Sequence, residues 1–480
     1  MKFNSLTLCV SLLFLLLTPA VVAQWVCGTP DPVDPIRGVG TGCSNYLNYI
    51  PDINHMNYSP ILTYRVNIHM FRRGDGSGIY QPSQTSDIQN EIALVNHHFS
   101  YMNSPSLPVS PLAVFIPDPK IRFELQNIFW HDDNTYYGYS SQCGSGPHSV
   151  YNTDGAIDIY YMDNTSISGA CGPTGFVNLF NFGYGWASSQ LIAHELGHVI
   201  GLPHTFSGCN DDVYDDTYHP DPNTGWAGCG PSESYSNCGG GSGISNNIMG
   251  YNKCRSYLSP KQIGQVRYRV IQLSGYRGFL KPDYDATQTV EIVSNETWEH
   301  SNYLVGDLIV KSGFQLTVKC TLFLASDSKI IVEPNAKLIV DGGVLTTNTE
   351  TDRWNGIYVT GNSTASQSLN PTLFGTVILK NGAVIEHADG ALNNFGLDAN
   401  NSIDWNSFGG IIQCTDVIFK NNRRSGQFMA YIHKNASGNP INDKSFFKKC
   451  SFGIDNDMLN GSHLYAHISQ WATRGIAVNS

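Results

Sequence analysis

The sequence predicts a mixed α+β domain followed by an all-β region. Up to about residue 280, strand-like and helical patterns alternate, and the last amphipathic helix begins at Ser259-Pro260. After Lys281-Pro282-Asp283 no helical periodicity appears, and short alternating apolar runs recur about every eight residues. This change divides the chain into an α+β domain at 61–280 and an all-β region at 285–480.

The N-terminus has the pattern of a secretory signal peptide. Met1-Lys2 precedes an apolar run from Leu6 to Leu17, and small or branched residues lead to Ala23. We assign 1–23 to this peptide and expect a secreted or extracellular protein, with attachment to a cell surface left open. No later segment reaches the roughly 20 apolar residues of a membrane helix, so we expect no membrane span. Residues 24–60 form an N-terminal segment, with a pro-segment as one interpretation.

The charge of the chain excludes some classes of partner. The 480 residues carry a formal net charge of -11 at pH 7, and no basic tract stands out. Nucleic acid and anionic membrane surfaces are therefore not expected to bind.

In the α+β domain, a strand at 64–70 opens the pattern, followed by a helix at 86–102 whose apolar residues recur at helical spacing. Two further strands are expected at 121–128 and 156–162, where apolar and polar side chains alternate. The next helix is expected to run from a cap at Ser188 or Ser189 to about Ile200. A region rich in Gly, Asn, Asp and Ser then extends to Met249.

The all-β region has short strands separated by Gly and Asn turns. The stretch from Leu308 to Thr346 shows this most clearly, and the segments 413–422 and 449–456 echo each other loosely. This texture resembles a right-handed parallel β-helix, in which successive coils stack. A β-sandwich is the alternative, because it also uses short alternating strands. The chain ends at Ser480 without a recognisable cap, so we expect a piece of a longer protein.

The chemistry is carried by the pattern H-E-L-G-H-V-I-G-L-P-H at 194–204. His194 and His198 are four residues apart, so both imidazoles project from one face of a helix and can reach one zinc ion. Glu195 lies between them, where it can act as a general base on water. Gly201 permits a sharp turn that brings His204 back as the third ligand. A helix with ordinary core histidines, as in an inactive descendant, is the plain alternative, but this spacing seldom arises by chance.

This pattern resembles the motif of the metzincin zinc peptidases, and the residues after it resemble the pappalysin family. HTFSGC begins at His204, and Asn247-Ile248-Met249-Gly250-Tyr251 precedes LSPKQIGQVR at 258–267. The resemblance implies that Met249 lies in a tight turn beneath the metal. It also implies that Tyr251 approaches the metal or stabilises an oxyanion. The strand at 156–162 would be the sheet edge that pairs with an extended substrate.

The family resemblance also implies a disulfide pattern in the loop after the motif. Cysteines in a secreted domain suggest disulfides, while the three in the all-β region suggest buried free thiols. For Cys27 a second interpretation stays open, because a thiolate near the mature N-terminus could bind zinc and keep a zymogen latent. The implied pairs are Cys209 with Cys238 and Cys229 with Cys254, the leftover pairs are Cys143 with Cys171 and Cys27 with Cys43, and the expected free thiols are Cys320, Cys414 and Cys450.

Two features bear on calcium and on specificity. Hard oxygen ligands lie where relatives bind calcium, at Asp211, Asp212, Asp215 and Asp216, with a solvated acidic loop as the equal alternative.

Relatives that prefer arginine after the cleaved bond have an aspartate before the cysteine that follows the methionine turn. Here Lys253 holds that place, so the preference is not carried over.

The resulting hypothesis is a secreted zinc-dependent metalloendopeptidase acting on protein or peptide substrates. A rival makes the chain an adhesion or carbohydrate-interacting protein with a vestigial protease, in which the all-β region contacts a cell surface or polysaccharide. The intact histidines and Glu195 argue against that loss. A polysaccharide lyase or hydrolase is a further rival, but the all-β region shows no convincing acid, base or cation cluster.

Overall fold

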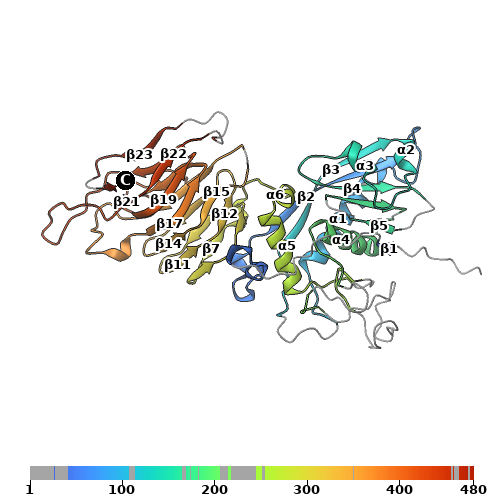
Figure 1. Cartoon of the computed structure of the whole chain (residues 1–480), viewed down its shortest axis with the longest axis horizontal. Coiled ribbons are helices and arrows are strands. Elements are labelled where there is room, and N and C mark those ends of the chain that lie inside the picture. The colour runs from blue at the N-terminus through green and yellow to red at the C-terminus, as the bar shows by residue number, and fades with distance from the viewer. Residues whose placement is uncertain are drawn as a thin grey trace, which may run out of the picture.

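The structure is a computed structural model, and Figure 1 shows it as two halves side by side. Among the described residues, all the α-helices lie in the half built from the earlier part of the chain. None of the helices in the described part of the chain has the length and apolar character needed to span a bilayer. The described residues are 26–27, 42–106, 114–164, 169–172, 175–181, 183–205, 214–217, 245–250, 255–349, 351–455, 458, 464–473 and 476–479.

A six-stranded sheet organises the first half. Its order is β1-β5-β6-β4-β2-β3, and every neighbouring pair is parallel except β5 with β6. The expected strands at 64–70, 121–128 and 156–162 are all present. The strand bounds are β1 Val26–Cys27, β2 Leu62–Arg72, β3 Ile121–Asp132, β4 Ile157–Met162, β5 Gly169–Cys171 and β6 Phe176–Phe180.

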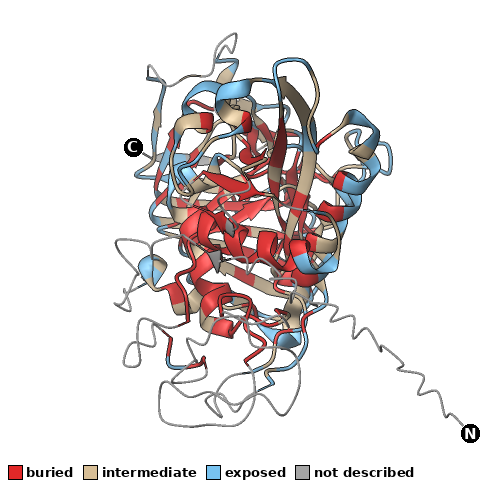
Figure 2. Cartoon of the chain, turned by 90° about the vertical axis from the view of Figure 1, so that its right-hand side faces the viewer, coloured by how far each residue is buried: buried red, intermediate tan, exposed pale blue. Residues whose placement is uncertain are grey.

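Three longer helices pack on this sheet. On α1 the apolar residues Ile88, Ile92, Val95 and Phe99 are buried, which confirms the helical spacing of the sequence. Figure 2 shows the buried residues gathered in the middle of this half, with exposed residues on the rim. The helix bounds are α1 Thr85–Ser100, α2 Asn134–Tyr137, α3 Gly146–Tyr151, α4 Trp186–Val199, α5 Pro260–Gln272 and α6 Ser274–Arg277.

The start of α5 follows directly from its sequence. The Ser259 side chain accepts a hydrogen bond from the Gln262 backbone N–H, and the Gln262 side chain accepts one from the Ser259 N–H. Pro260 occupies the first helical position, where its missing N–H costs nothing. By contrast, α4 begins at Trp186 with Gly185 as its cap, so the expected Ser188 or Ser189 cap is wrong; both serines lie inside the first turn.

The expectation that 156–162 forms the sheet edge is wrong. β4 lies between β6 and β2, and all six of its residues are buried. β5 is instead the antiparallel strand towards the edge, and among the described residues its outer side pairs only with the two residues of β1. A short run that alternates apolar and polar letters does not by itself separate an inner strand from an edge.

The second half, here called the parallel-sheet region, spans Val290–Asn479. Its strands alternate between two long sheets of orders β23-β20-β18-β16-β13-β10-β7 and β24-β21-β19-β17-β14-β11-β8. A shorter stack, β9-β12-β15, joins the second sheet through β17. The bounds are β7 Val290–Ile292, β8 Glu296–Trp298, β9 Asn302–Leu304, β10 Leu308–Val310, β11 Gln315–Val318, β12 Thr321–Leu324, β13 Lys329–Val332, β14 Lys337–Asp341, β15 Val344–Thr347, β16 Trp354–Val359, β17 Thr376–Glu386, β18 Ala388–Asn393, β19 Ile411–Lys420, β20 Arg424–Phe428, β21 Phe446–Lys448, β22 Ser451–Gly453, β23 Ala466–Gln470 and β24 Ala477–Asn479.

Apolar side chains stack from strand to strand inside this region. Leu308 pairs with Ile330, which pairs with Ile357, and all three are fully buried. The same alternation of buried and less buried positions recurs along β10, β11 and β12. All the strand ladders of the region are parallel in the described residues, unlike the antiparallel sheets of the sandwich alternative.

Short 3-10 helices make up an N-terminal segment, Gly42–Ser59, that lies between the two halves and is drawn blue in Figure 1. Its 3-10 helix η2 contacts α5, and η3 contacts β7. The Tyr58 hydroxyl also accepts a hydrogen bond from the N–H of Val293, which directly follows β7. The 3-10 helices are η1 Gly42–Ser44, η2 Tyr46–Tyr49, η3 Ile53–Tyr58, η4 Pro82–Gln84, η5 Ala286–Gln288 and η6 Pro371–Leu373.

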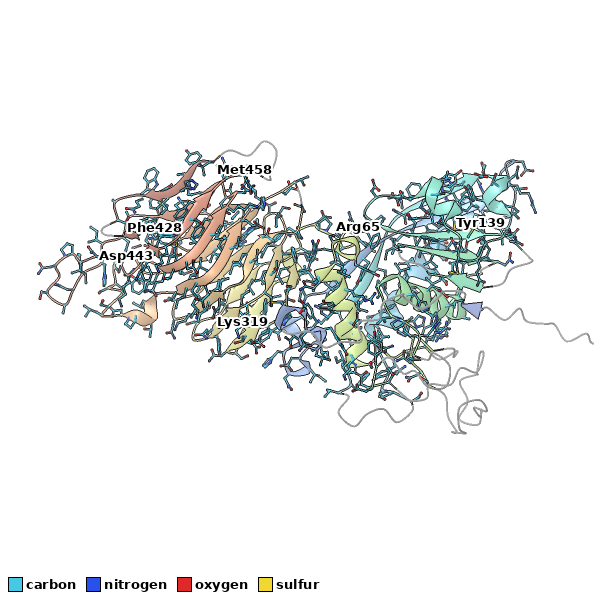
Figure 3. The ribbon with its side chains drawn as sticks, in the orientation of Figure 1. Arg65, Tyr139, Lys319, Phe428, Asp443 and Met458 are labelled. Atoms are coloured by element: carbon cyan, nitrogen blue, oxygen red, sulfur yellow. A yellow bond between two sulfur atoms is a disulfide. The ribbon has the colours of Figure 1, made fainter. Side chains whose placement is uncertain are left out.

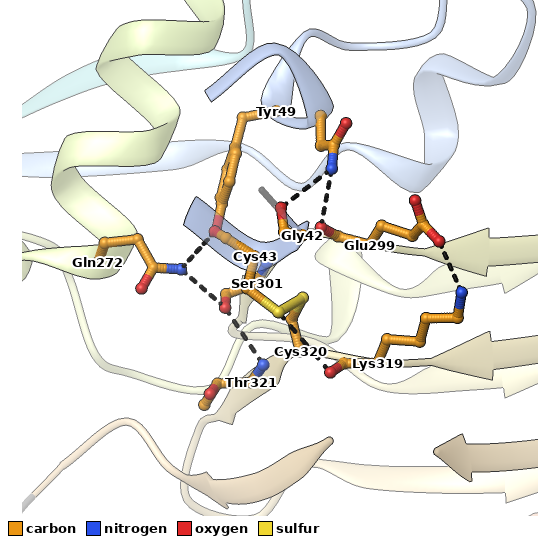
Figure 4. Close-up of a disulfide and its surroundings, with 10 residues drawn as sticks. Gly42, Cys43, Tyr49, Gln272, Glu299, Ser301, Lys319, Cys320 and Thr321 are labelled. Atoms are coloured by element: carbon orange, nitrogen blue, oxygen red, sulfur yellow. Dashed lines mark hydrogen bonds and ion pairs between the residues drawn. A yellow bond between two sulfur atoms is a disulfide. The ribbon is translucent and has the colours of Figure 1, made fainter. Parts of the chain in front are cut away.

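A disulfide fixes this segment to the parallel-sheet region. Cys43 pairs with Cys320, with their Cα atoms 5.7 Å apart (Figure 4). The expected pairing of Cys43 with Cys27 is therefore wrong, and so is the expectation that Cys320 is a free thiol. Folding brings Cys43 beside the first coils of the later region, a proximity that spacing along the chain does not reveal. Cys414 and Cys450 are free, as expected.

Tyr49 connects three parts of the junction (Figure 4). Its hydroxyl accepts a hydrogen bond from Ser301 N at 3.0 Å and another from the Gln272 side chain, and donates one to Cys43 O at 3.0 Å. Arg65 lies at the same junction, as Figure 3 shows, and donates to Gly278 O at 2.6 Å. The hydrophobic core of the first half also takes in Tyr303 from β9, so the two halves share buried surface.

Candidate active site

Three imidazoles meet at the end of α4. His194 and His198 lie one turn apart on the helix, and His204 follows after the chain has turned back. Nε2 of His198 is 3.2 Å from Nε2 of His194 and 3.1 Å from Nε2 of His204. All three side chains are buried, with 0, 4 and 6 % exposed. Among the described residues this is the only group of three or more His, Cys, Asp or Glu side chains compact enough to hold a metal ion.

Hydrogen bonds at the opposite ring nitrogens fix which nitrogen faces the centre. Nδ1 of His194 lies 2.7 Å from Ile248 O, and Nδ1 of His198 lies 2.8 Å from Leu202 O. A carbonyl oxygen only accepts, so Nδ1 carries the proton in both rings and Nε2 keeps its lone pair. Burial, followed by nearby Arg255 and the two other histidines, holds the pKa of His194 well below its usual value.

The donor set fits a zinc ion. A tetrahedral zinc with Zn–N bonds of about 2.0–2.1 Å places its nitrogen ligands about 3.3 Å apart. The observed separations of 3.1 and 3.2 Å are close to that value. Three histidine nitrogens with an open fourth position are a common protein share of a catalytic zinc site. The carbonyl partners of His194 and His198 orient two of these rings.

Two glycines of the motif are needed for different structural reasons. Gly201 has φ +101°, a left-handed conformation that ends α4 and redirects the chain towards His204. Gly197 faces the Met249 sulfur, and a side chain at 197 would collide with it. Met249 is fully buried beneath the helix, as expected of the methionine turn.

The methionine turn is held from several sides. The Asn247 side chain accepts a hydrogen bond from Met249 N at 2.9 Å and donates one to the Gln262 side chain on α5 at 2.8 Å. The carbonyl beside Met249, that of Ile248, receives the His194 N–H. The turn therefore links α5 to a zinc-ligand candidate on α4.

Glu195 is fully buried on α4 between the first two histidines. Its backbone oxygen packs against Gly172, directly after β5, so closely that a side chain at 172 would clash. The antiparallel strand β5 therefore lies beside the motif helix. This proximity places the next-to-edge strand β5 beside the catalytic candidates, in the place the sequence had assigned to β4.

The Peptidase M43 family model, described as pregnancy-associated plasma protein-A, matches residues 177–271, which include the three histidines, Glu195 and Met249. The part of the chain that carries the three histidines is therefore similar to this peptidase family. The match agrees with the resemblance seen in the sequence.

Solved structures of one protein also resemble this chain. They are Tannerella forsythia mature mirolysin in complex with a cleaved peptide and mirolysin in complex with compound 9. Each is 15 % identical with a TM-score of 0.33, covering 46 % of this chain and 95 or 96 % of the mirolysin chain. A comparison with curated proteins found no match.

The disulfide Cys143–Cys171 of the pappalysin-like domain is confirmed, with Cα atoms 5.3 Å apart. It ties β5 to the loop before α3. Gln142 in that loop adds a hydrogen bond from its side chain to Ala170 O at 3.0 Å. Both interactions brace the strand next to Glu195.

Two of the proposed calcium ligands make other interactions. Asp215 forms an ion pair with the Lys261 side chain, and Asp216 accepts a hydrogen bond from Lys261 N at 2.8 Å in the first turn of α5. Burial raises the pKa of Asp216. Calcium is not shown by these contacts.

Several predicted site residues lie outside the described residues. Nothing is therefore added here to the interpretation of their roles or pairings, and of Cys27 only the backbone is described. These residues are Tyr251, Lys253, Asp211, Asp212, Cys209, Cys229, Cys238 and Cys254.

Sequence reasoning missed three buried polar residues around α4. Glu91 and His98 lie on the buried stripe of α1, and polar letters at positions of apolar spacing were the available signal. Arg255 is 1 % exposed and donates to Gly250 O at 3.2 Å and to Gln190 O at 3.4 Å. It thus joins the methionine turn to α4, and no pattern in the sequence pointed to it.

Proposed function

We propose that the protein is a secreted zinc-dependent metalloendopeptidase. The observation that carries the proposal is the convergence of three Nε2 atoms from His194, His198 and His204, with Glu195 on the same helix. The family match supports a metallopeptidase, and the fit of the nitrogen spacing supports zinc as its metal.

A zinc ion bound by the three histidines would act as a Lewis acid on the scissile carbonyl and on the attacking water. Glu195 is not one of the three ligands and serves as the general base. It accepts a proton from the attacking water and delivers it to the leaving amine. Tyr251 is proposed to donate a hydrogen bond to the developing oxyanion.

We propose β5, rather than β4, as the strand that pairs with an extended substrate. Peptides often bind by adding a strand to an exposed sheet edge. β5 lies beside Glu195, and its outer side carries only Val26–Cys27 of β1. In this proposal β1 belongs to a pro-segment within 24–60, which must leave β5 before a substrate can pair there.

For the parallel-sheet region we propose a right-handed parallel β-helix. The stacked parallel ladders and the buried Leu, Val and Ile columns support it. Contact with a cell surface or a polysaccharide is the role proposed for this region.

The test is digestion of a peptide library by the purified full chain, before and after chelation with 1,10-phenanthroline. We expect cleavage to stop on chelation and to return when zinc is added. His204→Ala should lose both zinc and cleavage, because only two of the three imidazole ligands are left to hold the metal. His467→Ala, a histidine on β23 far from the motif, is the matched control and should behave as the parent. Full cleavage by protein shown to be free of metal would refute the proposal.

A further inference from the structure

The helix that carries the histidines begins against a buried carboxylate from another helix. α1 lies along α4 (Figure 1), and Glu91 is on the face of α1 that is turned inward. Its neighbours on that stripe, Ile88, Ile92 and Val95, are apolar. Glu91 is 0 % exposed, and a carboxylate that deeply buried needs a specific reason to be there.

Glu91 supplies the acceptor that the start of α4 lacks. The cap residue Gly185 has no side chain, and no acidic residue lies in the first turn of α4. Gly185 N donates to Oε2 of Glu91 at 2.6 Å, and Ser188, whose hydroxyl donates to Gly185 O at 3.0 Å, lies beside this carboxylate. A negative charge is most stabilising at a helix N-terminus, where backbone N–H groups are unpaired. Glu91 therefore caps α4 from outside the helix.

A second contact fixes the same turn. His98 lies two turns further along α1 and is 2 % exposed. Its Nε2 is 2.9 Å from the Ser189 hydroxyl. The Trp186 ring packs edge-on against the His98 ring, with centroids 4.5 Å apart. α1 thus contacts Gly185, Trp186, Ser188 and Ser189, which together are the first turn of α4.

The first turn of α4 matters for zinc because the helix is short and carries two ligands. His194 and His198 follow Trp186 by eight and twelve residues on the same 14-residue helix. A tilt of the first turn therefore moves both Nε2 atoms relative to His204, and metal sites tolerate only about 0.5 Å of such movement. We propose that Glu91 is a positioning residue for the zinc ligands, acting by capping α4 from α1. This inference rests on the proposed zinc function.

The proposal implies a dependence on pH. Burial, opposed by the hydrogen bonds from Gly185 and Ser188, raises the pKa of Glu91 to about 6. Below that pH the carboxyl becomes neutral and accepts the Gly185 N–H less strongly, so capping weakens in acid.

The other titratable groups around Glu91 do not remove this dependence. Tyr161 on β4 and Tyr184 before α4 face the carboxylate, and burial raises the pKa of both hydroxyls, so they stay protonated in this range. Tyr80 lies against Tyr161. Asp87, one turn earlier on α1, is exposed, and His98 stays neutral down to about pH 4.

The experiment measures release of zinc from the full-length holoprotein to the chromogenic chelator 4-(2-pyridylazo)resorcinol between pH 5 and pH 8. Glu91→Gln keeps an oxygen that can accept from Gly185 N but has no charge, and resembles the neutral acid. We expect it to release zinc about tenfold faster than the parent at pH 8, the lower end of effects seen for groups that orient ligands. The ratio of the two rates should fall towards one below about pH 5. Asp87→Asn, the same chemical change on the exposed side of α1, should follow the parent at every pH.

Two results would overturn the assignment of Glu91. The first is equal zinc release by Glu91→Gln and the parent at pH 8. The second is faster release by Glu91→Gln at every pH, which would indicate a merely structural role. Circular dichroism verifies folding. If Glu91→Gln does not fold, Ser188→Ala replaces it, because this change removes the hydroxyl that lies beside the carboxylate and donates to Gly185 O. The Ser188→Ala ratio should be smaller at pH 8 and should also fall in acid. If the parent itself binds no zinc, the proposed function is wrong and this inference is wrong with it. If the parent binds zinc and the variants release it at the parental rate, only the positioning role of Glu91 is refuted.

Discussion

The zinc-site candidates and the junction between the two halves are built in opposite ways. The three histidines and Glu195 come from eleven consecutive residues, 194–204, most of them on one helix. The junction joins residues that are far apart in the chain: 277 residues separate Cys43 from Cys320, and 223 separate Tyr49 from Gln272. A site built within one helix can be deduced from spacing, because helix geometry places its side chains. The contacts of the junction depend on the whole fold.

The largest expected difference concerns the two disulfides. In the chain-entropy model, a bridge closing 277 residues stabilises by about 5.5 kcal/mol, and one closing 28 residues by about 3.5 kcal/mol. We expect Cys43→Ser with Cys320→Ser to lower the free energy of unfolding more than Cys143→Ser with Cys171→Ser, measured by urea denaturation. Cys450→Ser, which removes a free thiol from the parallel-sheet region, is the control and should change little.

The effects of the same two double variants on catalysis should have the opposite order to their effects on stability. Cys143–Cys171 braces β5 beside Glu195, so its loss should raise KM for peptides, while loss of Cys43–Cys320 should leave KM near the parent value. Equal effects of both pairs on stability and on KM would remove the distinction between the site and the junction.

The second prediction concerns acid sensitivity beside the motif helix. Burial, helped by nearby His97 and Arg255, lowers the pKa of His98 to about 4. Between about pH 6.5 and pH 4 the unfolded chain binds a proton that the folded chain does not, so stability falls as the pH falls through this window. The shift corresponds to roughly 3 kcal/mol across the window.

His98→Gln keeps a polar atom for Ser189 and cannot titrate there, so its unfolding free energy should depend less steeply on pH than that of the parent. His97→Gln makes the same change at the exposed neighbouring position and should change the slope less than His98→Gln does. Parallel slopes for His98→Gln and the parent would contradict the buried neutral histidine.

The smallest expected effect is at the junction. Tyr49→Phe removes the hydroxyl that accepts from Ser301 N and donates to Cys43 O, leaving polar groups of the junction without a partner. Such a loss costs about 1–3 kcal/mol. Tyr46→Phe removes the same atom from the same 3-10 helix, on the side facing Lys261, and should cost less. Thermal unfolding measures the stability of the two variants. Equal losses of stability would mean that the Tyr49 hydroxyl does not stabilise the junction more than the Tyr46 hydroxyl does.

Much of the fold could be predicted from local patterns. The helix starting at Ser259 was predictable because its cap, its proline and its apolar spacing lie within a few residues of each other. The stripe of Ile88, Ile92 and Val95 likewise predicted α1. The alternating runs after residue 285 predicted strands, although not which of them pair.

The rest depends on contacts between distant segments. β4 was mistaken for an edge because strand order is not encoded in one strand. Cys43 was paired with Cys27 because spacing alone offered no sign that Cys320 comes beside it. The sequence did not single out Glu91, because its partner Gly185 lies 94 residues away.

The most direct test of the central claim separates metal binding from hydrolysis in one variant. Glu195→Gln in the full chain leaves all three imidazoles in place and removes only the general base. The account predicts zinc near one ion per chain by metal analysis, as in the parent, with peptide cleavage lowered by about a hundredfold to ten-thousandfold. Cleavage at the parental rate by this zinc-loaded variant would contradict the role of Glu195 and with it the proposed mechanism.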